Sequence, residues 1–328
     1  MSLAPLLLSE ADVARCLDPA SLIPLMRETL AAFSRGEAPQ PVRANIAIRP
    51  AGGFYGVMPA HVPASGAFGL KSVTFFPGNE GTGLPTHLAT ILLHDAATGA
   101  LTAIVDGRLI TELRTAAVSA VSVDLLARPE AARLAILGSG VQARSHLEAI
   151  ALVRRLEEIV VWSRTAAHAE TFAREMGPRA RCPVRTAATV REAVAKADIV
   201  VTVTPAAKPI LEAGWLRPGT HLCVVGSSHP RMREVDTDTV VGSRVFVDSR
   251  EAAAVEAGDL LIPLREGRWD LDSVVAELGD VASGAPGRGG PGEITLFKSL
   301  GLGVEDVASA ALALRRAREQ GLGAPLSL

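Results

Sequence analysis

The chain of 328 residues contains few cysteines: Cys16, Cys182 and Cys223, all widely spaced. Thiols so few and so scattered exclude a disulfide framework and a cysteine-built metal cluster, and no other metal site is expected. Cys223 lies inside the apolar run 221–225, which predicts a core residue. The chain also has no excess of one charge, with 33 basic against 35 acidic residues, so no nucleic acid or other polyanion is expected as a partner.

Long hydrophobic runs are missing as well. No segment reaches the roughly 20 consecutive apolar residues that a membrane span needs. The first 16 residues lack a basic segment, and their short apolar run is interrupted by Pro5. We therefore expect a cytoplasmic protein without a membrane span. Its length leaves room for two domains and a sizeable core.

Lysine is scarce, with four in the chain, and one of them stands in an unusual place. Lys71 lies inside the predicted strand 69–76, where strict alternation puts it on the same face as Val73 and Phe75. A merely solvated lysine is not expected there. Arg43 precedes another predicted strand, and Arg114 stands near the start of a helix rich in alanine and valine. For all three residues, a surface charge or a structural ion pair is the alternative to a functional role.

What the chain does contain is a short apolar strand, 134–137, that runs directly into Gly138-Ser139-Gly140 and then into helix-compatible sequence. Gly138 permits the tight turn, and Gly140 lets the backbone approach a phosphate without a Cβ in the way. Ala143 takes the place of the usual third glycine. A strand, a glycine turn and a helix N-terminus in this order bind the pyrophosphate of a dinucleotide. A purely structural turn is the alternative, but the βαβ pattern that follows favours a cofactor.

The second half of the chain alternates predicted strands with helices, which is typical of a parallel sheet in a Rossmann domain. The predicted strands cover residues 134–137, 158–162, 183–185, 198–204, 221–226 and 244–248. Ligands of such sheets bind at the carboxyl ends of the strands, so we expect the chemistry to follow residues 137, 162, 204 and 225.

The residues after the second of these strands predict which cofactor is bound. An acidic side chain there favours NAD, because it accepts hydrogen bonds from the adenosine ribose. This chain has Ser163-Arg164-Thr165 instead. A guanidinium with neighbouring hydroxyls suits a 2′-phosphate. We therefore expect NADPH, with NADH as a weaker alternative; an exposed arginine at a helix start is the other interpretation.

The first half of the chain predicts a different architecture. Residues 9–35 read as helix, with Ser9 as N-cap and with Pro19 and Pro24 dividing it in two. The strands predicted next cover 44–48, 54–58, 69–76, 88–94 and 100–106. No helical crossovers separate them, which indicates an antiparallel or mixed sheet. Later in the chain, the composition of residues 283–292 predicts a flexible loop that is either a lid or a linker. Residues 293–301 then lead into the last predicted helix, 304–320.

Six segments together resemble the ornithine cyclodeaminase/mu-crystallin family, and more closely its mu-crystallin-like ketimine reductase branch. Their order and spacing over nearly the whole chain carry the likeness. The segments are Gly69-Leu70-Lys71-Ser72-Val73-Thr74-Phe75, Leu84-Pro85-Thr86-His87, Arg114-Thr115-Ala116-Ala117-Val118-Ser119-Ala120, Ile136-Leu137-Gly138-Ser139-Gly140-Val141-Gln142-Ala143, Trp162-Ser163-Arg164-Thr165 and Phe297-Lys298-Ser299-Leu300-Gly301.

The resemblance implies an α/β protein with a Rossmann NAD(P)-binding domain, residues 121–302. It also implies an α+β domain for substrate binding and homodimer formation, residues 1–120 completed by the C-terminal helix in 303–328. Matching substrate and catalytic positions are Lys71, Arg114 and Arg43, which would hold an α-imino or α-amino carboxylate. Matching cofactor positions are Gly138, Ser139, Gly140, Val141, Gln142, Ser163, Arg164, Thr165, His168, Thr204, Pro205, Val225 and Ser299, with His87 and Arg114 near the nicotinamide end.

One departure separates two branches of that family. Cyclodeaminases resembling this chain carry an aspartate after the fifth Rossmann strand and a lysine four positions later, where this chain has Ser228 and Met232. The resemblance therefore implies NADPH-dependent reduction of a cyclic ketimine carboxylate, such as pyrroline-2-carboxylate or piperideine-2-carboxylate. Lys71 is then expected to be the proton donor or the anchor of a donating water. The alternatives are an amino-acid dehydrogenase or opine-type reductase, a cyclodeaminase, and a non-catalytic NADPH-dependent ligand-binding protein.

Overall fold

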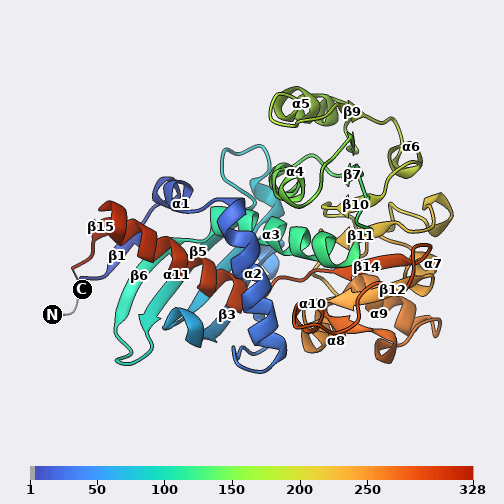
Figure 1. Cartoon of the computed structure of the whole chain (residues 1–328). Helices are drawn as coiled ribbons and strands as arrows, with labels where there is room; N and C mark the ends of the chain where they lie inside the picture. The colour runs from blue at the N-terminus through green and yellow to red at the C-terminus, as the bar shows by residue number, and fades with distance from the viewer. Residues whose placement is uncertain (1–3, 328) are drawn as a thin grey trace. The chain divides into compact units, whose positions relative to one another are not determined.

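A computed structural model describes residues 4–327, and the chain divides into two compact units. Unit 1 consists of residues 1–114 and 302–328, and unit 2 of residues 115–301. The predicted α/β class is confirmed (Figure 1). The first division falls after Arg114, six residues before the predicted boundary at residue 120. Both positions lie inside helix α3 (Arg108–Leu126), which carries the chain out of unit 1.

Unit 1 begins with two helices, α1 (Glu10–Cys16) and α2 (Pro19–Ser34). Ser9 caps α1 in a capping box with Asp12, as its hydroxyl predicts. Asp18 caps α2, and Pro19 occupies a first-turn position where its missing N–H removes no helical bond. The predicted division at Pro19 is therefore correct. Pro24 was wrongly expected to help divide the helix, since it lies within α2 without ending it.

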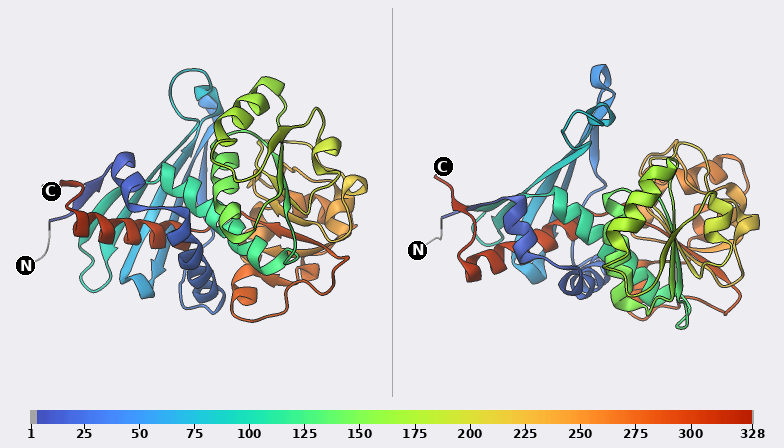
Figure 2. Two further views of the ribbon diagram at one scale, coloured as in Figure 1. Left: turned by 45° about the horizontal axis from the view of Figure 1, so that its top comes forward. Right: turned by 90° about the horizontal axis from the view of Figure 1, so that it is seen from above.

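The sheet of unit 1 has seven strands in the order β15-β1-β6-β5-β4-β3-β2. Strands β2 to β6 are antiparallel, whereas β1 pairs in parallel with β6, so the sheet is mixed. The C-terminal helix α11 (Gly303–Gln320) packs on β3, β4, β5 and α2, and Figure 2 shows it beside the sheet. The strands are β1 (Leu6–Leu8), β2 (Ala44–Ile48), β3 (Gly53–Val62), β4 (Ala67–Phe75), β5 (His87–Asp95), β6 (Leu101–Asp106) and β15 (Ala324–Pro325).

The sheet of unit 2 has eight parallel strands in the order β13-β12-β14-β11-β10-β7-β8-β9. The order reverses between β7 and β10, which is the place where doubly wound sheets bind their ligand. The strands are β7 (Arg133–Leu137), β8 (Glu158–Trp162), β9 (Val184–Thr186), β10 (Ile199–Thr202), β11 (His221–Val224), β12 (Ser243–Val247), β13 (Ala276–Glu277) and β14 (Ile294–Lys298).

Helices cover both faces of this sheet (Figure 2). Each face has its own apolar core. One core joins α3, α4 and α5 to the sheet, and the other joins α6, α7, α8 and α9. The helices are α4 (Val141–Val153), α5 (Ala166–Met176), α6 (Val190–Val194), α7 (Thr237–Val241), α8 (Arg250–Glu256), α9 (Gly258–Arg265) and α10 (Leu278–Ala282).

Strand β14 is the element that sequence patterning missed. Residues 293–301 were expected only to lead into the last helix, but Ile294–Lys298 form a central strand between β11 and β12. A run of five residues that ends in a lysine carries too little periodicity to identify a buried strand. Lys298 is nevertheless fully buried, because an acidic side chain lies beside it.

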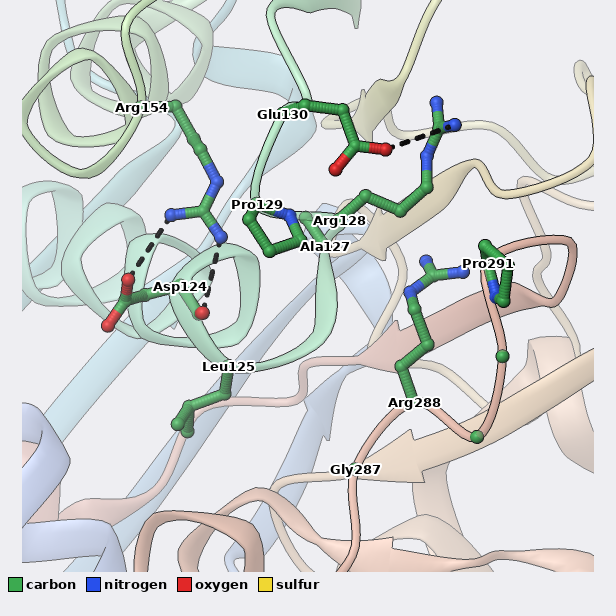
Figure 3. Close-up of a pocket in the computed structure, with 12 residues that line it drawn as sticks. Asp124, Leu125, Ala127, Arg128, Pro129, Glu130, Arg154, Gly287, Arg288 and Pro291 are labelled. Atoms are coloured by element: carbon green, nitrogen blue, oxygen red, sulfur yellow. Dashed lines mark hydrogen bonds and ion pairs between the residues drawn. The ribbon is translucent and has the colours of Figure 1, made fainter.

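Hydrogen bonds of arginine side chains hold the glycine-rich segment 283–292, which precedes β14, against its neighbours. Arg288 Nε donates to Leu126 O at 2.8 Å, and Arg288 Nη2 donates to Thr295 Oγ1 at 2.8 Å. Arg244 Nε holds Gly287 O at 2.9 Å. A concavity of about 620 Å³ lies beside this segment, and none of the predicted cofactor residues lines it. Figure 3 shows the residues around it. Its lining residues are Asp124, Leu125, Ala127, Arg128, Pro129, Glu130, Arg154, Gly287, Arg288, Gly289, Gly290 and Pro291.

Within residues 4–327, no helix is both long enough and apolar enough to cross a membrane.

Candidate active site

Lys71 is buried on the inner face of the unit 1 sheet. In β4 the alternating residues point to opposite faces, and Lys71 lies in one row with Met58 of β3 and Ile91 of β5, both buried. Only 2% of Lys71 is exposed. The alternation argument therefore placed this side chain correctly, on the face that α11 covers.

Two adjacent carboxylates in the first turn of α11 compensate the buried charge. Lys71 Nζ lies 2.6 Å from Asp306 Oδ2. Arg114 Nε donates to Asp306 Oδ1 at 2.9 Å, and Arg114 Nη1 donates to Glu305 Oε2 at 2.6 Å. Both carboxylates are fully buried. The cluster of Lys71, Arg114, Glu305 and Asp306 thus joins β4, α3 and α11, three segments far apart in the sequence.

Sequence reasoning missed Glu305 and Asp306. A signal was present, because the two acids interrupt the apolar run that surrounds them, from Val304 to Ala308. Adjacent carboxylates with apolar neighbours on both sides need a basic partner when they are buried. That pattern, combined with the scarce Lys71, could have predicted the pairing. The acidic pair was overlooked because acids in the first turn of a helix are common there for electrostatic reasons alone.

Burial and neighbouring charges set the protonation of this cluster. Burial lowers the pKa of Lys71 to about 8, although Asp306 opposes the shift. Burial alone would raise the pKa of Asp306, but Arg114 and Lys71 hold it below its usual value. Asp306 is therefore a carboxylate at neutral pH. At neutral pH Lys71 remains mostly protonated, and its pKa is close enough to neutral pH for the ammonium to release a proton readily.

Arg43 and His87 belong to the same region of unit 1. Arg43 immediately precedes β2, and its charge contributes to lowering the pKa of Lys71. His87 begins β5 and pairs with Phe75, on the inner face that also carries Lys71. Burial, followed by the charges of Lys71 and Arg114, lowers the pKa of His87 to about 4, so its imidazole is neutral at pH 7.

The predicted glycine turn of unit 2 has the geometry that a dinucleotide needs. Gly138 has φ +125°, and a Cβ at this position would lie 2.8 Å from Val203 O. Gly140 is the N-cap of α4 and supplies no side-chain cap, while a Cβ there would meet nothing within 4 Å. The start of α4 is therefore open to an approaching anion. Arg144 Nη1 steadies the turn by donating to Ser139 O at 2.7 Å.

The residues predicted to select the cofactor lie together after β8. Ser163 Oγ accepts a hydrogen bond from Ser139 Oγ at 3.0 Å, which ties this segment to the glycine turn. Arg164, Thr165 and His168 are exposed. A guanidinium that is exposed beside a hydroxyl can reach a phosphate on the adenosine ribose.

The other predicted cofactor residues follow neighbouring strands at the same edge of the sheet. Thr204 and Pro205 follow β10, Val225 follows β11, and Ser299 follows β14. Val141 and Gln142 begin α4. Ser228, which replaces the cyclodeaminase aspartate, is an exposed residue of the segment after β11. The structure thus brings the cofactor candidates to one sheet edge and groups Lys71, Arg114, Arg43 and His87 in unit 1, while their functional roles remain predictions.

Within the described part of the chain, no group of three or more histidine, cysteine or acidic side chains is arranged to hold a metal ion.

Residues 4–321 of the chain match the model of the ornithine cyclodeaminase/mu-crystallin family. The chain is 42% identical to the ketimine reductase mu-crystallin of Mus musculus over 316 residues, 95% of this chain and 97% of that protein. Its fold matches a Thermococcus litoralis Δ1-pyrroline-2-carboxylate reductase in complex with NADH and L-proline, with TM-score 0.96, 38% identity and coverage of 98% and 100%. It also matches an archaeal alanine dehydrogenase dimer with bound NAD, with TM-score 0.94, 29% identity and coverage of 99% and 100%.

Removing one charge from the buried cluster should destabilise the protein strongly. Asp306→Asn leaves Lys71 and Arg114 without their shared carboxylate, and breaking a buried ion pair in this way costs about 3–5 kcal/mol. Urea unfolding monitored by circular dichroism measures the loss. Glu37→Gln is the control, because Glu37 pairs with Arg35 on the surface of the same unit, where a pair contributes about 0–1 kcal/mol. Equal stabilities of the two variants would contradict the assignment.

Proposed function

Because the chain belongs to the ornithine cyclodeaminase/mu-crystallin family, we propose that it uses NADPH to reduce the C=N bond of a cyclic ketimine carboxylate. The products would be cyclic amino acids such as L-proline or L-pipecolate. The observation that carries the proposal is the buried pair of Lys71 and Asp306, with the pKa of Lys71 lowered to about 8. A buried ammonium poised in this way can protonate a substrate near neutral pH.

The related proteins support an oxidoreductase of this class. The mouse relative is a ketimine reductase, and the Thermococcus litoralis structure is of a pyrroline-2-carboxylate reductase holding NADH and L-proline. A nicotinamide dinucleotide is thus a cofactor of similar proteins. The preference for NADPH is our own inference from Arg164 and its neighbouring hydroxyls.

The residues of the chain fit the nicotinamide dinucleotide, since Gly138 and Gly140 leave the start of α4 open to its pyrophosphate. When bound, the reduced cofactor supplies a hydride to the imine carbon, C2. Arg114 and Arg43 would bind the substrate carboxylate, and Glu305 and Asp306 orient the Arg114 guanidinium. Lys71 Nζ would donate a proton to the imine nitrogen, which makes C2 more electrophilic. Asp306 stabilises the ammonium until it donates.

The outer face of the unit 1 sheet supports a homodimer. Leu70, Leu92 and Ile104 form an apolar row across β4, β5 and β6 on the face opposite Lys71. On the same face, Ile46 is 60% exposed and Leu88 is 42% exposed. Exposed apolar surface of this kind marks an interface. An alanine dehydrogenase of similar fold is described as a dimer. We propose that two copies of this chain associate through this face.

A substrate panel tests the proposed reaction directly. Pyrroline-2-carboxylate and piperideine-2-carboxylate should each support NADPH oxidation, followed as loss of absorbance at about 340 nm, a wavelength chosen for the reduced nicotinamide ring. Pyruvate with ammonia or methylamine tests an amino-acid dehydrogenase or opine-type reductase. Higher kcat/KM with these open-chain pairs than with both cyclic imines would replace the proposed substrate class. Nucleotide binding without turnover of any substrate would favour a ligand-binding protein.

Ornithine should not be a substrate. Cyclodeamination releases ammonia and needs a base to take up protons along the path, and the hydroxyl of Ser228 cannot serve as that base near neutral pH. The protein incubated with ornithine and NAD⁺ or NADP⁺ should therefore form neither proline nor ammonia. Sustained proline formation would place the chain in the cyclodeaminase branch instead.

Lys71→Met should lower kcat by about 10²–10⁴-fold, the usual contribution of a positioned acid. In the unchanged protein, kcat/KM should fall as pH rises through about 8, because the ammonium of Lys71 is lost there. The variant should lack this decline. Lys208→Met, an exposed lysine in unit 2, is the control. A decline that persists in Lys71→Met would belong to the substrate or to another group.

Arg164→Ala should erode the preference for NADPH. A charge-assisted hydrogen bond to the 2′-phosphate contributes about 1.5–3 kcal/mol, which corresponds to roughly 10- to 150-fold in affinity. The ratio of kcat/KM for NADPH to that for NADH should fall by this factor, while the value for NADH changes little. If the unchanged protein uses both cofactors equally well, Arg164 has no such role.

The oligomeric state tests the proposed interface. Light scattering coupled to size-exclusion chromatography should show a dimer, and Ile46→Glu combined with Leu88→Glu should shift it to the monomer, because each introduced carboxylate would be buried without a partner. Leu152→Glu is the control, since Leu152 is an exposed leucine of unit 2 whose exposed fraction lies between those of Leu88 and Ile46. A dimer that survives the double substitution must use another surface.

A further inference from the structure

Glu234 is a fully buried carboxylate that collects four hydrogen bonds. Its Oε1 accepts from the Thr204 backbone N–H and from Thr204 Oγ1, each at 2.7 Å. Its Oε2 accepts from Thr202 Oγ1 and from the Gly226 backbone N–H, each at 2.7 Å. Four donors around one side chain favour its charged form and oppose the effect of burial, which disfavours a charge.

The two backbone donors belong to segments that follow adjacent strands. Thr204 follows β10, and Gly226 follows β11. The segments are in direct contact, because a Cβ at Gly226 would lie 2.2 Å from Thr204 O and 2.5 Å from Glu234 Oε1. One carboxylate therefore holds two backbones together at the sheet edge that carries Thr204, Pro205 and Val225, three of the predicted cofactor residues.

A buried ion pair between Asp259 and Lys298 holds the backbone of Glu234 in place. Asp259 Oδ1 accepts from the Glu234 backbone N–H at 2.7 Å, and Asp259 Oδ2 lies 3.0 Å from Lys298 Nζ. Lys298 Nζ also donates to Ser227 O at 2.5 Å. All three ionisable side chains are fully buried. Burial and the charge of Asp259 raise the pKa of Glu234, whereas Lys298 opposes that shift. Lys298 immediately precedes Ser299, which is another of the predicted cofactor residues.

We infer that Glu234 is a positioning residue for the dinucleotide: it holds residues 203–205 and 225–227 at the spacing in which they receive the cofactor. Glu234 acts through these backbones, because its own side chain is completely enclosed. This inference rests on the proposed function, since it assumes that the carboxyl ends of β10 and β11 face a nicotinamide dinucleotide.

Glu234→Gln isolates this role. A glutamine has nearly the same shape, but its NH₂ group cannot accept a hydrogen bond. Whichever way the amide is turned, either the Thr204 N–H or the Gly226 N–H loses its acceptor, whereas the threonine hydroxyls can rotate. The Kd of NADPH, measured by titrating its fluorescence, should rise by about tenfold or more, the factor expected for a lost bond to a charged group. The Kd of NADH should rise equally, because the change is remote from Arg164.

Asp198→Asn is the matched control. Asp198 is also a buried carboxylate that accepts from two backbone N–H groups, Ala132 at 3.1 Å and Arg133 at 3.0 Å. It precedes β10, at the opposite end of that strand. Asp198→Asn should lower Tm and leave both Kd values unchanged. A Kd for Glu234→Gln within about twofold of the unchanged protein would overturn the inference, whatever happens to Tm.

Thr202→Val decides the matter if Glu234→Gln does not fold. It removes the hydroxyl donor to Glu234 Oε2 from the last residue of β10 at nearly constant volume. The Kd of NADPH should then rise by about two- to tenfold, as for loss of one uncharged donor, and an unchanged Kd would overturn the inference. If the unchanged protein binds neither NADPH nor NADH, the proposed function fails and this inference with it. Normal binding in the unchanged protein and in the variants refutes the inference alone.

Discussion

The charge of Lys71 has to be balanced inside the protein, and this constraint organises unit 1. An ammonium removed from water is costly unless a carboxylate is held against it. Asp306 lies 2.6 Å from Lys71 Nζ and also binds Arg114, so β4, α3 and α11 must assemble before either cation is compensated. The last helix of the chain therefore completes a site that begins at residue 71. Shortening or shifting that helix would affect the chemistry of the site as well as the stability of the sheet.

Unit 2 also has to compensate buried charges, but here the carboxylates outnumber the lysines. Glu234 and Asp259 are two buried carboxylates. Lys298 pairs with Asp259, and its charge also acts on Glu234, while backbone N–H groups supply the remaining compensation. Backbone donors cannot rotate away, so the carboxylate and the backbone fix each other's position. In unit 1 the compensating groups are flexible side chains, which suits the proton transfer proposed for Lys71. In unit 2 the compensating groups are rigid, which suits the proposed role of this sheet edge in cofactor binding.

Features that depend on neighbouring residues could be predicted from the sequence. The glycine turn at Gly138 and Gly140, the cap at Ser9 and the alternation around Lys71 each depend on a few neighbouring residues, and each prediction agrees with the structure. What the sequence concealed were partnerships over long separations. Glu305 and Asp306 read as ordinary first-turn acids until Lys71 and Arg114 are seen beside them. Strand β14 was hidden for the same reason, since Lys298 looks solvated until Asp259 is placed next to it. The family resemblance located several candidate residues, but it did not reveal which groups hold them.

The burial of two of the four lysines also determines which lysines an amine-reactive reagent can modify. Lys71 and Lys298 are enclosed by protein, whereas Lys196 and Lys208 are exposed, and both of the exposed lysines lie in unit 2. A reagent such as an activated ester needs an accessible, deprotonated amine, so among the lysines it would modify these two. Coupling to an activated surface or attachment of a dye through lysine would therefore anchor the protein by unit 2. The lysine that lies nearest to the proposed chemistry would remain unlabelled.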